Sequence, residues 1–324
     1  MNQLDNLLKK VPDSVLNAIA LISGIITIFP AIFSLIRIII SLIKGSFSIS
    51  TISKPYVAVV MVCALNVLLI NKILKYRKIQ AQTRSVFSKS YYSLLHDYRN
   101  LKGELEVSEY DKNAVYHKIV NFSTNTLDSL CSIFNILTRQ EVSACIKIIE
   151  PSNNLEYATA KVKTFCRSKN SDSRRFQYDN DSTRNETIIC KNTDFSTIVQ
   201  PGKTVSCFYK RDLVAFQKQH QDTDEEYLNS NPEWKKFYKA TIVAPIRIAN
   251  IRNSKVKSED SYTILGFLCI DSLSTHAFEE SQETYYTKIV KAYAALLYSV
   301  LDVYKNKIGY VSSNAVHIGQ NPDG

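Results

Sequence analysis

Glycine is scarce in this sequence: only 8 of the 324 residues are Gly, and no Gly-rich phosphate-binding loop occurs. The GxSxG and HExxH motifs are absent too, and the 5 His residues are scattered without ligand spacing. None of the 7 Cys residues forms a CxxC pair, and their number is odd, so neither a zinc site nor a disulfide framework is expected. We therefore predict no enzyme, no metal and no cofactor, and we expect reduced thiols of a cytosolic domain.

The chain carries a formal net charge of +10, but its basic residues form no low-complexity tail and no run interleaved with aromatic residues. A nucleic-acid polymer is therefore not an expected partner. The positive charge is concentrated near the N-terminus and in the middle of the chain. In the middle it mildly favours an anionic small ligand, and a solvated basic surface explains it equally well.

Two long apolar stretches near the N-terminus are typical of membrane spans. Residues 15–36 contain no charged side chain, and the apolar run resumes after Arg37. A second apolar stretch covers residues 56–73. Because about 20 apolar residues suffice for a helix to cross a bilayer, we predict a transmembrane hairpin over residues 1–78, with spans at about 15–43 and 56–73.

Two other interpretations of these stretches are a cleaved signal peptide and a hairpin buried in a soluble protein. The first stretch is too long for a signal peptide, and no small-residue cleavage pattern follows it. We predict a multi-pass protein of the inner (cytoplasmic) membrane. More Lys and Arg residues flank the two spans than lie between them, and this excess predicts that both chain ends lie in the cytoplasm. Arg37 either snorkels to the lipid headgroups or lines, with Asn66 and Asn71, a polar path in a bundle of hairpins.

Residues 79–108 are expected to form an amphipathic helix that connects the hairpin to the rest of the chain. Its apolar residues recur at spacings of four and three: Phe87, Tyr91, Leu94, Tyr98, Leu101 and Leu105. Such a seam suits either a helix that faces a core or a parallel coiled coil in a homo-oligomer.

Residues 109–305 have the pattern of an α+β domain, and residues 306–324 are expected to form a flexible tail. Helical periodicity covers residues 109–139 and 281–305, with a short helix at 193–199. Runs of β-branched and apolar residues predict strands at 142–149, 157–166, 204–210, 241–248 and 263–272. The polar region 167–186 is expected to be a mobile loop.

Two of these strands carry a resemblance to a known family. Residues 241–248 read TIVAPIRI and residues 263–272 read TILGFLCIDS; with the polar loop between them, Phe278 and the terminal amphipathic helix, they resemble the second half of a GAF domain. Residues 229–238 look like the variant found in bacterial membrane-attached GAF-like proteins. The resemblance implies a GAF/PAS-like antiparallel sheet with the terminal helices on one face and a ligand pocket on the other. It also implies a sensory module, often dimeric, that binds cyclic nucleotides or other small molecules.

Five residues are candidates for contact with such a ligand: Arg211, Trp234, Tyr238, Arg247 and Asp271. Each arginine either meets an anionic ligand or lies in solvent at the end of a strand. Trp234 and Tyr238 either stack on a base or fill a core. Asp271 is either a pocket carboxylate or, as the favoured interpretation, a capping or turn residue after its strand.

No kinase, cyclase, phosphodiesterase or DNA-binding region follows the domain in this sequence, so the predicted hairpin is the remaining candidate output. We therefore hypothesise a membrane-anchored sensor-effector whose small signal has a nucleotide second messenger among its candidates. The layout resembles that of membrane-disrupting effectors of antiphage defence. The alternative is a regulatory membrane anchor whose GAF-like domain binds a protein partner.

Overall fold

A computed structural model describes residues 33, 36, 39–40, 43–44, 54–106, 111–150, 159–171, 173–180, 187–199, 206–221, 223, 226–249 and 262–308. The chain divides into two compact units, Met1–Gln82 and Thr83–Gly324. The boundary between them falls inside one long helix, α3 (Lys54–Glu106).

The predicted membrane hairpin belongs to the first unit. Its first span, residues 15–43, lies almost entirely outside the described residues, and its second span, residues 56–73, falls within α3. In the described part of the chain, none of the helices combines the length and the apolar character that crossing a membrane requires. The hairpin therefore stays a prediction.

The second unit is built on a six-stranded sheet in the order β3-β2-β1-β6-β5-β4. Every neighbouring pair of strands is antiparallel. The strands are β1 (Ser143–Ile149), β2 (Lys161–Arg167), β3 (Thr187–Ile188), β4 (Phe208–Lys210), β5 (Ala240–Ala249) and β6 (Tyr262–Ser272). The strands predicted at 157–166 and 204–210 are therefore present but shorter than predicted.

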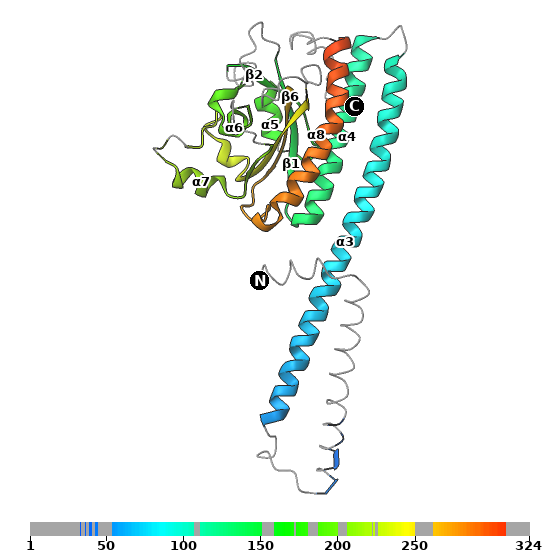
Figure 1. Ribbon diagram of the computed structural model, residues 1–324, viewed down its shortest axis with the longest axis vertical. Coiled ribbons are helices and arrows are strands. Elements are labelled where there is room, and N and C mark those ends of the chain that lie inside the picture. The colour runs from blue at the N-terminus through cyan, green and yellow to red at the C-terminus, as the bar shows by residue number, and fades with distance from the viewer. Residues whose placement is uncertain are drawn as a thin grey trace. The chain divides into compact units, whose positions relative to one another are not determined.

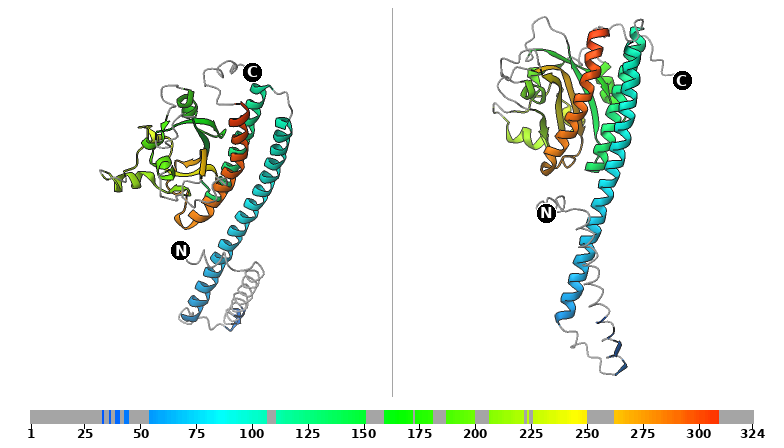
Figure 2. Two further views of the ribbon diagram at one scale, coloured as in Figure 1. Left: turned by 45° about the horizontal axis from the view of Figure 1, so that its top comes forward. Right: turned by 45° about the vertical axis from the view of Figure 1, so that its right-hand side comes forward.

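Two helices, α4 (Lys112–Thr138) and α8 (Glu283–Val303), cover one face of the sheet (Figure 1). They lie next to each other in both views of Figure 2, and a π-helical turn, η6 (Tyr304–Ile308), follows α8. The Asp111 side chain caps α4 by accepting a 2.9 Å hydrogen bond from the Asn113 N–H. The C-terminal part of α3 joins this layer, because Leu94, Leu101 and Leu105 are buried in the same core as α4 and α8.

Alternation along β5 divides the interior into two cores. Ile242, Ala244 and Ile246 belong to the core under α4 and α8, whereas Val243 belongs to the core on the opposite face. This division follows from strand geometry, because successive residues of a strand point to opposite faces of the sheet.

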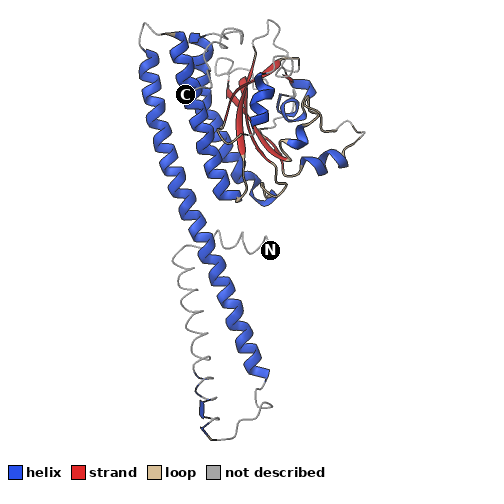
Figure 3. Ribbon diagram, turned by 180° about the vertical axis from the view of Figure 1, so that it is seen from behind, coloured by secondary structure: helices blue, strands red, loops and turns tan. Residues whose placement is uncertain are grey.

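Short helices cover the second face of the sheet, on the side away from α4 and α8 (Figures 1 and 3). They are α5 (Ser173–Asn180), α6 (Thr193–Val199), α7 (Leu213–Gln219) and the 3-10 turns η2 (Ile189–Lys191) and η3 (Trp234–Lys236); a further turn, η5 (Glu280–Gln282), precedes α8. The mobile loop predicted over 167–186 was wrong for its first part, because Arg167 ends β2 and residues 173–180 form α5, whereas residues 181–186 lie outside the described part of the chain. The antiparallel sheet has α4 and α8 on one face and a cover of small helices on the other, which is the α+β arrangement that the sequence resemblance implied.

At Gly266 the backbone of β1 leaves no room for a side chain on β6. A Cβ atom at this position would lie 2.1 Å from the Lys147 carbonyl oxygen, far inside van der Waals contact. The register of β5 against β6 also shifts nearby, between Ile246 and Arg247. The glycine of the GFLCIDS segment is therefore required by backbone contact rather than by a turn.

Candidate functional site

A polar pocket lies between the second face of the sheet and the small helices that cover it. Its volume is about 80 Å³. Strands β1, β2 and β6 supply the floor, and α5, α6 and residues 229–238 supply the walls. The lining residues are Cys145, Lys147, Arg167, Arg175, Thr187, Asn192, Asp194, Phe195, Asn229, Ser230, Asn231, Phe237, Tyr238, Cys269 and Asp271.

The floor of the pocket follows from strand alternation and register. Cys145 and Lys147 are two residues apart on β1, and Cys269 and Asp271 are two residues apart on β6, so each pair shares a face of the sheet. Cys145 lies directly opposite Cys269 on one side. It lies opposite Arg167 of β2 on the other side.

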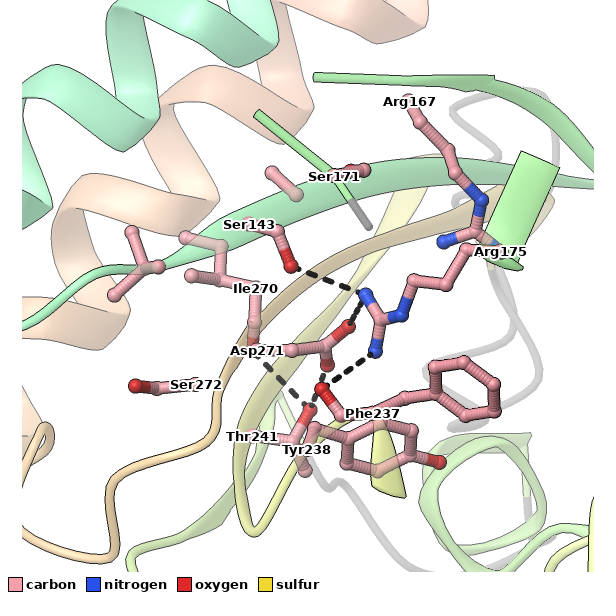
Figure 4. A network of polar contacts seen from close by, with 12 residues as sticks. Ser143, Arg167, Ser171, Arg175, Phe237, Tyr238, Thr241, Ile270, Asp271 and Ser272 are labelled. Atoms are coloured by element: carbon pink, nitrogen blue, oxygen red, sulfur yellow. Dashed lines mark hydrogen bonds and ion pairs between the residues drawn. The ribbon is translucent and has the colours of Figure 1, made fainter. Parts of the chain in front are cut away.

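Arg175 of α5 is fixed against the end of β6 (Figure 4). Its Nη1 donates to Asp271 Oδ2 at 2.8 Å and to Ser143 Oγ at 3.0 Å. The Thr241 hydroxyl donates to the other Asp271 oxygen at 3.0 Å. The guanidinium also lies 5.3 Å from the centre of the Tyr238 ring. Each oxygen of the Asp271 carboxylate is thus engaged within the protein, which makes this pair a rigid frame for the pocket.

A second set of hydrogen bonds holds Arg167 and Lys147 at the other side of the pocket floor. Arg167 Nη2 donates to Asp179 Oδ1 at 2.9 Å, and the Thr164 hydroxyl donates to the same oxygen at 2.9 Å. Lys147 Nζ in turn donates to Thr164 Oγ1 at 3.1 Å. Both cations that line the floor are therefore held by neutral or acidic partners on β2 and α5.

Asp194, in the first turn of α6, differs from these charged residues because it forms no ion pair with a described residue. Its side chain is buried and lines the pocket, and its Oδ1 accepts a 3.1 Å hydrogen bond from the Phe195 N–H. Among the described residues, no cation forms an ion pair with it. Burial, together with the negative charge of nearby Asp271, raises the pKa of Asp194 from 3.8 to about 7. The positive charge of Lys147 and the backbone N–H groups of Phe195 and Asp194 oppose this rise. The pocket thus holds a carboxyl group whose pKa is close to neutral pH and that forms no ion pair with a described cation.

Aromatic side chains support the wall beside Asp194. The Asn229 amide donates to the Tyr238 hydroxyl and, at 3.2 Å, to the Tyr227 hydroxyl. Trp234 packs behind them, with its ring centroid 5.0 Å from that of Tyr227 and 5.6 Å from that of Tyr238. Burial raises the pKa of Tyr227 and of Tyr238, so both phenols stay protonated as hydrogen-bond donors.

The structure brings two of the five sequence-predicted ligand residues, Tyr238 and Asp271, together at the pocket. Asp271 is a strand residue paired with Arg175, so the favoured interpretation of it as a cap or turn residue was wrong. Trp234 is buried behind the wall. Arg211 is exposed and contacts the Thr275 carbonyl and His276, and Arg247 lies on β5 away from the pocket lining.

Only one of the two membrane candidates lies in the described part of the chain. Arg37 lies outside the described residues, and Asn66 lies in α3, half-buried. Neither proposed role for them is tested.

Sequence reasoning missed the most distinctive pocket residues, Arg175 and Asp194. Arg175 lies in the polar region 167–186, where no periodicity marks α5 as a covering helix. Asp194 follows the Asn192–Thr193 pair before a short apolar run, a pattern that signals a helix start rather than a buried acid. On the floor of the pocket, only Asp271 at the end of β6 could be recognised from the sequence as a candidate pocket carboxylate.

No protein-family model matches this chain, and no curated protein matches it. Solved structures that resemble it include the GAF domain of an Acinetobacter phosphoenolpyruvate-protein phosphotransferase, at 11% identity and a TM-score of 0.34, covering 67% of this chain and 97% of that one. A putative GAF sensor protein from Burkholderia vietnamiensis shows 12% identity and a TM-score of 0.33, covering 66% and 98%. Type II free methionine-R-sulfoxide reductase from Thermoplasma acidophilum shows 14% identity and a TM-score of 0.32, covering 56% and 96%. The fold of this chain is defined by its own strand order and by the placement of α4 and α8 on one face of the sheet.

Proposed function

We propose that this protein is a sensor whose GAF-like domain binds a small polar molecule in the pocket and uses Asp194 to recognise it. The observation that carries this proposal is the Asp194 carboxyl, which is buried, lines the pocket and has no ion-pair partner among the described residues. Burying a carboxylate without a partner is costly, and a ligand that donates hydrogen bonds to it removes that cost.

The pocket chemistry favours a particular class of ligand. Asp194 calls for an N–H donor, such as an ammonium, amidine or amide group. Phe195 supplies an apolar surface, while the lining amides of Asn192 and Asn229 bond to protein groups and hold the wall in place. A volume of about 80 Å³ is well below the ~300–1,000 Å³ typical of sites for drug-sized ligands. Among the signals considered, a compact molecule with an N–H group therefore suits the pocket better than a cyclic dinucleotide.

The chain connects the pocket floor directly to the helical layer. Strand β1 follows α4 in sequence, and α8 follows β6, so a shift of either floor strand acts on a helix of the opposite face. Helix α4 is tied to the C-terminal part of α3: the Tyr98 and Phe122 ring centroids are 6.4 Å apart, and Lys118 Nζ lies 2.6 Å from Glu104 Oε2. Ligand binding would thereby be communicated to α3.

The proposed output is the N-terminal region. In this proposal the hairpin of residues 1–78 lies in the inner membrane with both ends in the cytoplasm, and the ligand-bound domain controls it within a homo-oligomer. In its most specific form, the proposal is that the protein disrupts the membrane in antiphage defence. The uncharged stretches 15–36 and 55–71 support it at the level of sequence.

A second candidate function is a regulatory anchor that captures a protein partner. Exposed aromatic residues on α3 favour it: Tyr92 is 75% exposed and Tyr91 is 53% exposed. Phe87 stacks on Tyr91 with ring centroids 6.1 Å apart. Contiguous exposed aromatic surface is typical of protein interfaces, and a second copy of this chain would use it equally well.

The ligand hypothesis is tested by a thermal-shift screen of the full-length protein against small amines, amino acids, nucleobases and cyclic nucleotides. We expect a compact N–H donor to raise the melting temperature of the wild-type protein and to have little effect on Asp194→Asn. Asp212→Asn is the matched control, because Asp212 caps α7 outside the pocket lining. The proposal is wrong if hits stabilise Asp194→Asn as strongly as the wild type.

The output hypothesis is tested with dye-loaded phospholipid vesicles and the best ligand from the screen. Full-length protein plus ligand should release dye, and protein lacking residues 1–78 should not. Ligand binding without dye release, combined with capture of a specific protein partner, would favour the regulatory anchor instead.

A further inference from the structure

Two cysteines face each other across the floor of the pocket. Cys145 of β1 and Cys269 of β6 are direct cross-strand partners, and both line the cavity. Opposed residues of an antiparallel pair have Cα atoms roughly 4.5–5.5 Å apart and side chains on one face. A disulfide needs Cα atoms about 4.4–6.8 Å apart, so these two cysteines can be joined with little movement of the backbone. In the structure both are free thiols.

The surroundings of Cys145 favour its thiolate. Its sulfur interacts with the Cys269 thiol, and Arg167 stands opposite it on β2. The hydrogen bond from Cys269, with help from the positive charges of Arg167 and Lys147, lowers the pKa of Cys145 below that of an ordinary thiol. The pKa of Cys269 is raised by the same hydrogen bond and by burial. The position of Arg167 opposite Cys145 on β2 favours Cys145 as the nucleophile, and Cys269 lies directly across the strand pair as the second thiol.

We propose that Cys145 and Cys269 form a peroxide-reactive dithiol that closes to a disulfide on the floor of the pocket. This goes beyond the sensor function above, because it assigns the pocket a covalent response to oxidants. The Cys145 thiolate attacks one oxygen of a small peroxide, the O–O bond breaks, and the departing oxygen leaves as hydroxide or alkoxide and takes a proton. The Cys269 sulfur then attacks the Cys145 sulfenic acid, which forms the S–S bond and releases water.

With a peroxide as the oxidant, the atoms and electrons of this reaction balance. Two thiols together lose two electrons and two protons, and hydrogen peroxide becomes two molecules of water. A cavity of about 80 Å³ admits a molecule of this size, since about 10–15 Å³ suffices to hold one water. The product bridges the two central strands of the sheet and removes the two thiols from the pocket surface.

The other buried cysteines lack these features. Cys131 and Cys166 belong to the core under α4 and α8, on the opposite face of the sheet. Burial raises the pKa of Cys131 to about 12 and also raises the pKa of Cys166. Cys190, in contrast, is exposed. A selective reaction at the Cys145–Cys269 pair is therefore distinguishable from general oxidation of buried or exposed thiols.

The test is peptide mapping of the full-length protein after brief treatment with hydrogen peroxide, under non-reducing conditions. We expect a cross-linked peptide joining Cys145 and Cys269, lighter by two hydrogen atoms than the reduced pair, which disappears on reduction. Cys269→Ser should leave Cys145 as a sulfenic acid that a dimedone probe labels, and Cys145→Ser should leave Cys269 unlabelled. Cys131→Ser is the matched control and should keep the cross-link.

The wild-type protein alone can overturn the proposal, so it does not depend on how well the variants fold. If peroxide oxidises Cys190 while Cys145 and Cys269 stay reduced in folded protein, the pair is not a reactive dithiol. Ligand binding by Asp194 and oxidation of the Cys145–Cys269 pair are measured separately. A negative result for one hypothesis therefore does not contradict the other.

Discussion

Arg175 and Asp271 form an ion pair that is almost completely withdrawn from solvent. Arg175 Nη1 lies 2.8 Å from Asp271 Oδ2, with the two side chains only 6% and 8% exposed. The pair joins α5 to the end of β6, and its two residues are 96 positions apart in the sequence. It therefore fixes the cover of the pocket to its floor, and the remaining polar groups, Asp194 among them, are arranged around it.

Removing one partner of this pair should be strongly destabilising. Arg175→Met leaves the Asp271 carboxylate buried without its cation, and the expected loss in the free energy of unfolding is about 3–5 kcal/mol. Asp271→Asn should lower the free energy of unfolding by a similar amount, because it leaves the Arg175 guanidinium buried without its anion. Chemical denaturation of the full-length protein, followed by tryptophan fluorescence of Trp234, measures both.

The control for this prediction is an exposed ion pair. Lys236 and Glu233 are 59% and 58% exposed, so Glu233→Gln should change stability by no more than about 1 kcal/mol. Equal small effects at Arg175 and Glu233 would show that the buried pair does not hold α5 to the sheet.

Asp194 makes stability depend on pH in a defined direction. Its pKa is 3.8 ordinarily and about 7 in the folded protein, so folding binds a proton between these values. The free energy of unfolding contributed by this group therefore falls as the pH rises from about 4 to about 7, and it levels off above 7. A shift from 3.8 to about 7 corresponds to on the order of 4 kcal/mol.

Asp194→Asn isolates that contribution because the amide does not titrate. Compared with the wild type, the variant should gain stability progressively as the pH rises through this window and remain more stable at pH 8. Denaturation curves at several pH values provide the comparison. A stability difference between variant and wild type that stays constant with pH would contradict a raised pKa.

Gly266 and Gly103 should respond oppositely to the same substitution. Gly266→Ala places a methyl group 2.1 Å from the Lys147 carbonyl oxygen, and forcing β6 away from β1 should cost about 1–3 kcal/mol or more. Gly103→Ala meets no atom within 4 Å and lies in α3, where it should stabilise the helix by about 0.5–1 kcal/mol. Thermal denaturation of the two variants distinguishes them, and a neutral Gly266→Ala would argue against the close approach of β1 and β6.

The strands of the sheet could be predicted from the sequence because their signal is local. The alternation in TIVAPIRI assigns Ile242 and Val243 to opposite faces without knowledge of any other segment. The long helices α4 and α8 were predictable for the same reason. Their apolar periodicity is contained within each segment.

The pocket could not be predicted because its defining relationships are not local. Nothing near Asp271 identifies Arg175 as its partner, and nothing near Cys145 indicates that Cys269 lies opposite it. The first relationship depends on where α5 lies over the sheet, and the second depends on the register of β1 against β6. Asp194 was missed for a related reason: an acidic residue in the first turn of a helix is ordinarily an exposed, dipole-stabilising group, and only the fold buries it.

The central claim is that Asp194 recognises a small N–H donor in the pocket, and calorimetric titration of a ligand from the screen tests it most directly. Wild-type protein should bind the ligand with an affinity that rises as the pH increases through about 7, because the ionised Asp194 carboxylate is the stronger acceptor. Asp194→Asn should weaken binding by about 10- to 100-fold, the worth of a hydrogen bond to a charged group, while Arg211→Gln should bind as the wild type does. Binding by folded Asp194→Asn at the wild-type affinity, without dependence on pH, would contradict the account.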